Sequence, residues 1–289
     1  MQSLTEFGLE TIELSSPQLI EALYRHGTVE LRGAVDGVEE LEGGFVVLRY
    51  GSQSALALVF NQEVQLVKDT LDFQGVKPRD AAQTCFMWAL KNRQLTVCLG
   101  AAGCGKTYIA TAFAVHQMMK QDKKTVFLKP TRFVGGESNA IAAVPGGVAE
   151  KLEPYVESFL QHLRSLLGAD ASNLLGKWQQ KRQIEFAAVE LCRGRHFANS
   201  VVILDEAQNL TFHELCSVIS RVDDSSTLIV MGDPLQIDIE GRAWEETGLA
   251  RLLESSAWWS APFAVALELE TSYRGKLARL VGDALKEQY

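Results

Sequence analysis

The sequence predicts an α/β protein with a parallel sheet covered by helices on both faces, preceded by a small β-rich module. Continuous apolar runs alternate with helix-like segments from about residue 81, as strands buried on both faces require. The first 75 residues instead contain short strand-like runs separated by DG, GG and GS turn signals. Apolar residues make up 47% and charged residues 22% of the 289 positions, which is typical of a folded globular protein.

We expect two domains, because a chain of this length has room for one large α/β domain and one smaller domain. The small acidic β-rich module is residues 1–75 and the larger domain is residues 76–289, with the Gly and Pro of LDFQGVKPRDAA at the boundary. The acidic segment VDGVEELEGG predicts a hairpin tip. The module's strands are expected at residues 11–14, 28–35, 44–50 and 54–60, and its helix at residues 17–27.

The larger domain is expected to be one doubly wound sheet, because strands and helices alternate along it. Apolar runs predict five strands, at residues 95–100, 124–130, 200–207, 226–233 and 263–270. Helical spacing predicts five helices, at residues 81–92, 106–121, 150–168, 184–194 and 211–222.

The net charge of −8 is unevenly distributed. Residues 1–75 contain 4 Lys or Arg and 12 Asp or Glu, whereas the rest of the chain contains 24 of each kind. Residues 121–200 hold 11 basic and 8 acidic residues, a mild excess that suits a polyanion. A solvated face of mixed charge is an equally good interpretation of this excess.

The five cysteines are scattered without a C-x-x-C pair, so neither a disulfide framework nor a zinc site is indicated. Cys104 lies in a glycine-rich loop, where a redox role competes with the simpler role of a small loop residue. No apolar run has the length of a membrane span, and MQSLTEFGLE lacks the features of a signal peptide. We therefore expect a cytoplasmic protein without a membrane partner.

The run GAAGCGKT, residues 100–107, lies between a predicted strand and a predicted helix and matches the phosphate-loop pattern G-x-x-x-x-G-K-[ST]. Its glycines let backbone N–H groups point at phosphate oxygens, Lys106 reaches the β- and γ-phosphates, and the Thr107 hydroxyl is a magnesium ligand. A glycine turn that binds nothing is the alternative. The candidates for nucleotide binding are Gly100, Ala101, Ala102, Gly103, Cys104, Gly105, Lys106, Thr107 and Tyr108.

The run VVILDEAQ places Asp205 and Glu206 at the carboxyl end of a predicted buried strand, where ligands of parallel sheets bind. Asp205 is the expected magnesium partner and Glu206 the expected base for an attacking water. Capping of the next helix is the simpler alternative. The following strand ends in MGDPLQ, which brings Asp233 and Gln236 to the same edge, where an amide is able to sense the γ-phosphate.

The order phosphate loop, DEAQ, GDPLQ resembles that of superfamily one helicases. GAAGCGKTYIA, PGGVAEKLEPYVESFL and RGRHFANSVVILDEAQNLTFHELCSVISRVDDSSTLIVMGDPLQIDI resemble the PhoH-like ATPase family, and this resemblance extends from residue 76 to about residue 255. It implies a RecA-like P-loop NTPase core, hydrolysis of ATP with Mg²⁺, a link to single-stranded RNA or DNA, and ring-shaped oligomers among relatives.

The resemblance also implies roles for residues outside the three motifs. KPRDAAQ resembles the glutamine motif that reads adenine, so Gln83 is a candidate for contacts with the base. KPTRFVGGE makes Lys129, Thr131 and Arg132 candidates for contacts with a nucleic-acid backbone.

Several arginines and tryptophans have two interpretations each. In SYRG, Arg274 is a candidate for the γ-phosphate, in cis or from a neighbouring subunit, or for a helix cap or nucleic acid. Arg193 and Arg195 are candidates for contacts with phosphate, with nucleic acid or with a neighbouring subunit, and surface salt bridges are the alternative. Base stacking competes with core packing at Trp244, Trp258 and Trp259.

The leading hypothesis is an Mg²⁺-dependent ATPase that couples hydrolysis to single-stranded RNA or DNA. Too few residues follow SYRG for a second RecA-like domain, so we expect adjacent subunits of a homo-oligomer to complete the site. The second hypothesis is an ATP-controlled assembly or protein-binding module, which the negative charge favours. A phosphotransferase is the third, although it has no need of Glu206 and Gln236.

Overall fold

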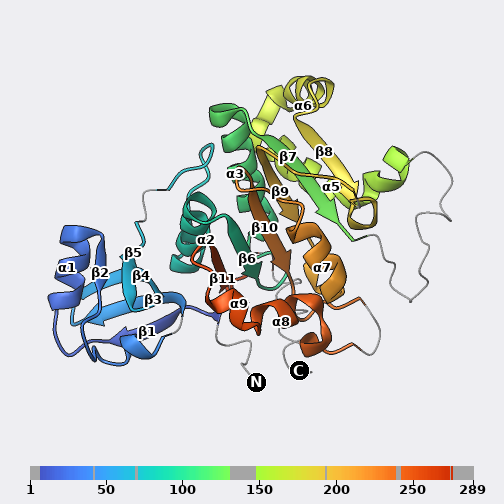
Figure 1. Ribbon diagram of the computed structural model, residues 1–289. Helices are drawn as coiled ribbons and strands as arrows, with labels where there is room; N and C mark the ends of the chain where they lie inside the picture. Colours follow the sequence, from blue (N-terminus) through green and yellow to red (C-terminus); the bar gives the residue numbers. More distant parts are fainter. Residues whose placement is uncertain are drawn as a thin grey trace.

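The computed structural model describes residues 7–41, 43–68, 71–130, 148–192, 194–238, 242–273 and 275. These residues form two sheets, and the smaller sheet lies beside the larger one at the blue end of the chain in Figure 1. Helix α1 packs Leu19, Ile20 and Leu23 against one face of the smaller sheet. Its elements, in chain order, are β1 (Glu10–Glu13), α1 (Gln18–His26), β2 (Thr28–Glu30), the 3-10 turn η2 (Val38–Glu40), β3 (Gly43–Tyr50), β4 (Gln53–Phe60) and β5 (Glu63–Leu66).

Two details of the smaller sheet differ from the sequence prediction. The expected hairpin tip at residues 35–44 is wrong, because the strand order is β1-β3-β4-β5-β2 and the strands that flank this segment are not neighbours. Val38 is fully buried, so the segment packs onto the core as a 3-10 turn. Strand β5 was not expected. A two-residue turn at Asn61 and Gln62, both with positive φ, joins it to β4, and this pair lacks the usual Gly signal.

The larger sheet has six strands, all parallel, in the order β11-β6-β10-β9-β7-β8. The five predicted strands are confirmed as β6 (Leu95–Leu99), β7 (Lys124–Lys129), β9 (Ser200–Leu204), β10 (Thr227–Gly232) and β11 (Ala264–Glu268). Four of the five predicted helices are confirmed as α2 (Ala81–Asn92), α3 (Lys106–Gln121), α5 (Val148–Leu167) and α7 (Phe212–Ile219). Further elements are α6 (Ala171–Gln180), α8 (Gly248–Leu253), α9 (Ser256–Trp259) and the 3-10 turns η3 (Gly168–Asp170), η4 (Val189–Leu191), η5 (Ala207–Asn209) and η6 (Trp244–Glu246).

Helices cover both faces of this sheet, which explains why its strands are mostly apolar. Along β9, Val201 and Ile203 enter a core shared with α2, α3, α5 and α6, whereas Val202 and Leu204 enter a core shared with α7, α8 and α9. A strand buried on both faces has no solvent-facing position that favours a polar residue. The predicted α/β class, with a parallel sheet covered by helices on both faces and a β-rich N-terminal module, is confirmed.

The predicted helix at residues 184–194 is wrong. Residues Ile184–Ala188 form strand β8, which pairs in parallel with β7, and η4 follows it. Glu, Ala and Leu in this segment favour a helix by intrinsic preference. The free edge of β7 outweighs that preference, because β8 satisfies the hydrogen-bonding groups of that edge and buries Ile184 and Ala188.

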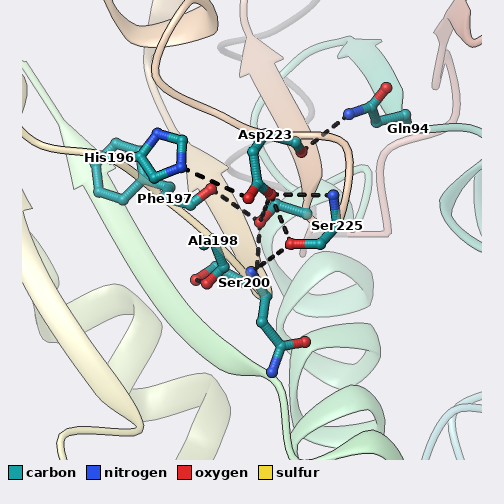
Figure 2. Close-up of polar contacts among 9 residues, drawn as sticks. Gln94, His196, Phe197, Ala198, Ser200, Asp223 and Ser225 are labelled. Carbon is teal, nitrogen blue, oxygen red and sulfur yellow. Dashed lines mark hydrogen bonds and ion pairs between the residues drawn. The ribbon is translucent and has the colours of Figure 1, made fainter.

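A network of polar contacts fixes the amino ends of β9 and β10 (Figure 2). The Asp223 carboxylate accepts hydrogen bonds from the Ser225 hydroxyl at 2.6 Å and the Ser226 hydroxyl at 3.1 Å. His196 Nε2 lies 3.6 Å from the other oxygen of Asp223. Ser, His and Asp occur together here, but they are not arranged as a catalytic triad, in which the serine hydroxyl donates to the histidine. The Ser225 hydroxyl instead donates to the Asp223 carboxylate, and its oxygen accepts from the Asn199 N–H at 2.7 Å. The network therefore stabilises strand ends, at the edge of the sheet opposite to the glycine-rich loop.

The N-terminal module packs directly against the larger domain. Phe45 of β3 meets the Trp88 ring of α2 edge-on, with centroids 5.9 Å apart, and Phe7 stacks on Trp259 at 6.2 Å. Trp258 is buried in the core beside α8, and Trp244 packs against the same core. These contacts favour the core interpretation of the tryptophans, and we retain the domain boundary near residue 75 as a proposal. Among the residues that the structure describes, no helix combines the length and the apolar character that a membrane crossing needs.

Candidate active site

The carboxyl ends of β6, β10 and β9 meet at one edge of the larger sheet. Strand β10 lies between the other two and pairs with both. The glycine-rich loop follows β6, Asp233 follows β10 and Asp205 follows β9. Ligands of open parallel sheets bind outside such ends. The strand order therefore brings motifs that are far apart in the sequence to one place.

The glycine-rich loop depends on backbone conformations that favour glycine. Gly100, Gly103 and Gly105 have φ values of 138°, 88° and 101°. Helix α3 begins directly after them at Lys106, so the free N–H groups of its first turn and the positive end of its dipole face the loop. The predicted strand–loop–helix arrangement of an anion-binding loop is present.

Gly100 is also required by its neighbours, and this gives a testable consequence. A Cβ at this position would lie 2.5 Å from the carbonyl oxygen of Leu269, whereas Gly33, with a similar φ of +125°, faces open space. We expect Gly100→Ala to lower the free energy of unfolding by about 3 kcal/mol or more, since backbone strain and a clash with backbone add together. Gly33→Ala introduces strain alone and is expected to cost about 1 kcal/mol. Urea unfolding of both variants measures the difference, and equal losses would rule out the contact with Leu269 as the cause.

Lys106 is buried and folds back across its own loop. Its Nζ donates to the carbonyl oxygens of Gly100 and of Ala101, the latter at 3.2 Å. Burial lowers the pKa of the ammonium, but the neighbouring cysteine thiols and the carboxylates of Asp233 and Asp205 outweigh it, so that the net pKa is raised. Lys106 is therefore charged at neutral pH and positioned over the loop.

Two buried carboxylates face this loop. The pKa of Asp205 is raised to about 6, mainly by burial and secondly by the negative charge of Glu206. Burial also raises the pKa of Asp233. One oxygen of Asp233 accepts from the Leu235 N–H at 3.0 Å, while the other is buried without a hydrogen-bond partner among the described residues. Carboxylate and hydroxyl oxygens are the ligands that Mg²⁺ prefers. Asp205 and the Thr107 hydroxyl, which line one cavity, thus form a donor set that fits this ion.

Glu206 is held in an unusual backbone conformation. Its φ is 56°, in the left-handed region that non-glycine residues rarely adopt and that occurs often at functional sites. One carboxylate oxygen lies 3.6 Å from Lys129 Nζ, and the other accepts a hydrogen bond of 2.8 Å from Gln208 Nε2. The simpler role of a helix cap does not apply to the Glu206 side chain, because it makes no capping hydrogen bond to the 3-10 turn η5 that follows it, and Thr211 caps α7.

A cavity of about 880 Å³ lies at this edge of the sheet, large enough for a nucleotide. The five residues that the sequence placed around one triphosphate all line it: Lys106, Thr107, Asp205, Glu206 and Gln236. Five further predicted binding residues line it as well: Gln83, Ala102, Gly103, Gly105 and Tyr108. Gly100, Ala101 and Cys104 belong to the loop but are not among the described residues that line this cavity.

The Gln83 side chain supports the backbone of the loop at Cys104. The Gln83 amide donates to the Cys104 carbonyl at 2.9 Å and accepts from the Arg79 N–H at 3.0 Å, so both of its ends are engaged within the protein. The contact of Gln83 with adenine stays a prediction. Burial raises the pKa of the Cys104 thiol, which favours a small buried loop residue over a redox group.

Tyr273 of the SYRG run lies across the loop, a placement that sequence reasoning missed. Its backbone N–H donates to the Gly103 carbonyl at 3.0 Å, and its hydroxyl donates to Asp80 at 2.5 Å. The Arg79 guanidinium lies 5.0 Å from the centre of its ring. Tyr273 therefore joins the C-terminal segment to the phosphate loop and to the first turn of α2. The Tyr-Arg pair in SYRG was the available sequence signal, but it indicated a role for Arg274 alone.

The remaining predicted residues lie elsewhere. Lys129 lines the cavity and pairs with Glu206, which places it beside the nucleotide site. Arg195 forms an ion pair of 2.6 Å with Glu185, in agreement with the salt-bridge alternative. Three candidate groups fall outside the described residues: Thr131 with Arg132, Arg193, and Arg274.

Comparisons with known proteins agree with these motifs. A family model described as PhoH-like protein matches residues 75–286. Protein PhoH of Escherichia coli (strain K12) is 33% identical over 178 residues, which cover 62% of this chain and 49% of the relative. Protein PhoH2 of Bacillus subtilis (strain 168) is 31% identical over 243 residues, which cover 81% of this chain and 54% of the relative. The chain thus spans about half the length of the curated relatives it matches.

Among solved structures, the Pif1 helicase from Candida albicans matches 73% of this chain and 44% of its own, at 16% identity and a TM-score of 0.36. A likeness at this level supports no further argument. The family match instead covers well over half of the chain and includes all three phosphate-site motifs. The chain belongs to the PhoH-like protein family and contains a P-loop NTPase core.

Proposed function

We propose that the protein is a magnesium-dependent ATP hydrolase. The observation that supports this most strongly is the meeting of Lys106, Thr107, Asp205, Glu206 and Gln236 around one cavity at the carboxyl edge of the parallel sheet. A glycine turn that binds nothing has no need of a buried lysine or of two buried carboxylates beside it.

The phosphates of ATP would bind to the loop N–H groups and to Lys106. The Lys106 ammonium exchanges the carbonyls of its own loop for phosphate oxygens, which form stronger, charge-assisted hydrogen bonds. Asp205 and Thr107 would hold Mg²⁺, which would supply positive charge against the phosphates. Arg274 is retained as a candidate for additional charge at the γ-phosphate.

Glu206 would accept a proton from the attacking water, and Gln236 would orient that water or contact the γ-phosphate. Both residues line the same cavity as Asp205 and Asp233. A phosphotransferase uses the hydroxyl of an acceptor and needs neither group. Release of phosphate from ATP and Mg²⁺ without any acceptor, and its loss when the metal is chelated, therefore test the proposed reaction directly.

We further propose that hydrolysis is coupled to single-stranded RNA or DNA in a homo-oligomer. The basic excess in residues 121–200 supports a polyanion partner, and in a homo-oligomer a neighbouring subunit would complete the nucleotide site. Lys129, one of the candidate contacts with nucleic acid, lines the nucleotide cavity itself.

Added single-stranded RNA or DNA is expected to raise the rate of ATP hydrolysis, and the increase is expected to shrink between low and moderate salt. The reason is that affinity for a nucleic acid arises mainly from contacts of Lys and Arg with phosphates, which salt weakens. Phosphate release at two salt concentrations, with the particle mass measured with and without nucleotide, provides the measurement.

The alternative is an ATP-controlled assembly or protein-binding module, which the acidic charge of residues 1–75 supports. In that case added nucleic acid leaves the rate of ATP hydrolysis unchanged and is not retarded by the protein in a gel, while ATP changes the particle mass. Heparin, a polyanion without bases, is the control that separates a general charge effect from binding of nucleic acid.

A further inference from the structure

Gln208, the last residue of DEAQ, is fully buried and uses its amide in three hydrogen bonds. Its Nε2 donates to the Glu206 carboxylate at 2.8 Å and to the Gln236 carbonyl at 2.7 Å. Its Oε1 accepts from the Asp233 N–H at 3.1 Å. A neutral amide has two N–H donors, so both of them are engaged. One side chain thus connects the carboxylate of Glu206, the proposed base, with two backbone groups of the GDPLQ segment, the Asp233 N–H and the Gln236 carbonyl.

The neighbourhood of Gln208 leaves space for this arrangement. A Cβ at Gly232 would lie 3.3 Å from Gln208 Oε1 and 2.9 Å from Leu249 Cδ2. Gly232 is the last residue of β10 and is directly followed by Asp233. The absence of a side chain at Gly232 lets the Gln208 amide lie against the end of the neighbouring strand. The amide therefore bridges the ends of β9 and β10.

Glu206 depends on neighbours to keep its position. Its left-handed backbone is unfavourable for a residue with a side chain. Two groups hold the carboxylate: Lys129 at 3.6 Å, in an ion pair that is partly open to solvent, and Gln208 at 2.8 Å. Solvent weakens an ion pair of the first kind, whereas a hydrogen bond from a buried amide to a charged group is stronger. Gln208 is the main constraint on the orientation of Glu206.

We propose that Gln208 is a positioning residue that aims the Glu206 carboxylate at the attacking water and couples it to the Gln236 segment. This inference rests on the proposed ATP hydrolysis. Gln208 lies behind Glu206 and Gln236, fully buried, so it acts through them without touching the nucleotide. A shift of the GDPLQ chain on binding of the γ-phosphate would then be transmitted to the base through one amide.

Gln208→Met, which keeps the length of the side chain and removes all three hydrogen bonds, is expected to lower kcat roughly 10- to 100-fold, because a small misplacement of a reacting group has effects of that size. The KM for ATP and the affinity for a non-hydrolysable ATP analogue should stay within about threefold, since the phosphate loop is unchanged.

Asn209→Leu is the matched control. Asn209 is the next residue of the same turn and is also buried. Its side chain binds the same loop through Asp238, at 2.8 and 2.9 Å, and its one hydrogen bond with Glu206 joins the two backbones, which Asn209→Leu leaves in place. Its kcat should fall by less than about threefold. If Gln208→Met fails to fold, Gln208→Glu keeps the shape but sets an oxygen against Glu206, and it should lose kcat in the same selective way.

A double-mutant cycle tests whether Gln208 acts through Glu206. In a Glu206→Gln background, measured in single turnovers, Gln208→Met should change the rate by less than about threefold, because the group that it positions is already disabled. Equal losses of kcat in both backgrounds, or equal losses in Gln208→Met and Asn209→Leu, would overturn the inference. If the unmodified chain releases no phosphate from ATP, the proposed function fails first and this inference fails with it.

Discussion

Lys106→Ala is expected to lower the affinity for ATP by roughly 10- to 150-fold, because hydrogen bonds to charged groups contribute about 1.5–3 kcal/mol. The residual rate of hydrolysis at saturating ATP should fall by a further factor of about 10²–10³, the usual cost of removing one preorganised donor from a developing charge. The buried Lys106 ammonium is the cation that the structure places directly over the phosphate loop, within hydrogen-bonding range of the Ala101 carbonyl. Calorimetric titration with an ATP analogue and phosphate release measure the two effects.

Lys123→Ala is the matched control for this variant. Lys123 also donates to a backbone carbonyl, that of Ser225 at 3.0 Å, but it lies near the amino ends of the strands. Its removal changes the net charge by the same amount without touching the cavity, so affinity and rate should be retained. Thermal unfolding of both variants separates loss of binding from loss of fold. Normal binding of ATP by Lys106→Ala would mean that the loop does not hold the triphosphate.

The positions of most elements in the larger domain follow from the sequence. A strand that is buried on both faces needs apolar residues at nearly every position, and this produces a continuous apolar run in the sequence. Residues 95–99 and 200–204 show this directly, and helices α2 and α3 begin and end where the pattern predicts. The motifs at the strand ends were predictable for the same reason. Once strands are parallel, their carboxyl ends share an edge, and Asp205 and Glu206 must lie near the phosphate loop.

Other features depend on contacts that no local pattern reveals. Strand β8 forms because β7 offers a free edge, although its residues favour a helix. The order of strands, with β10 between β6 and β9, places Asp233 at the end of a strand that neighbours the one leading into the loop. Gln208 and Tyr273 lie within the DEAQ and SYRG runs, but no local pattern reveals their contacts, since each acquires its role from partners far away in the chain. The residues that line the proposed phosphate site could be predicted from the sequence, whereas the residues that fix their positions could not.

Glu206→Gln is expected to retain binding of ATP and to lower kcat by about 10²–10⁴, the range by which a positioned general base accelerates a reaction. The amide is nearly isosteric with the carboxylate, so Gln208 still has an oxygen to bind and the pocket keeps its shape. Loss of one negative charge beside Asp205 leaves the affinity for ATP unchanged or slightly higher, because phosphates repel carboxylates. Single-turnover hydrolysis and titration with ATP provide the measurements.

Glu185→Gln is the control, because Glu185 is also a carboxylate in an ion pair, with Arg195 at 2.6 Å, but lies on β8. Its kcat should equal that of the unmodified chain. The two phosphate-site variants then separate two roles: Lys106→Ala loses affinity, whereas Glu206→Gln loses turnover alone. Such a separation is expected only if the carboxylate acts on the water and the lysine acts on the phosphates. Hydrolysis at the normal rate by Glu206→Gln would show that another group accepts the proton, and the buried Asp233 carboxylate, with one oxygen unpaired among the described residues, would be the next to replace.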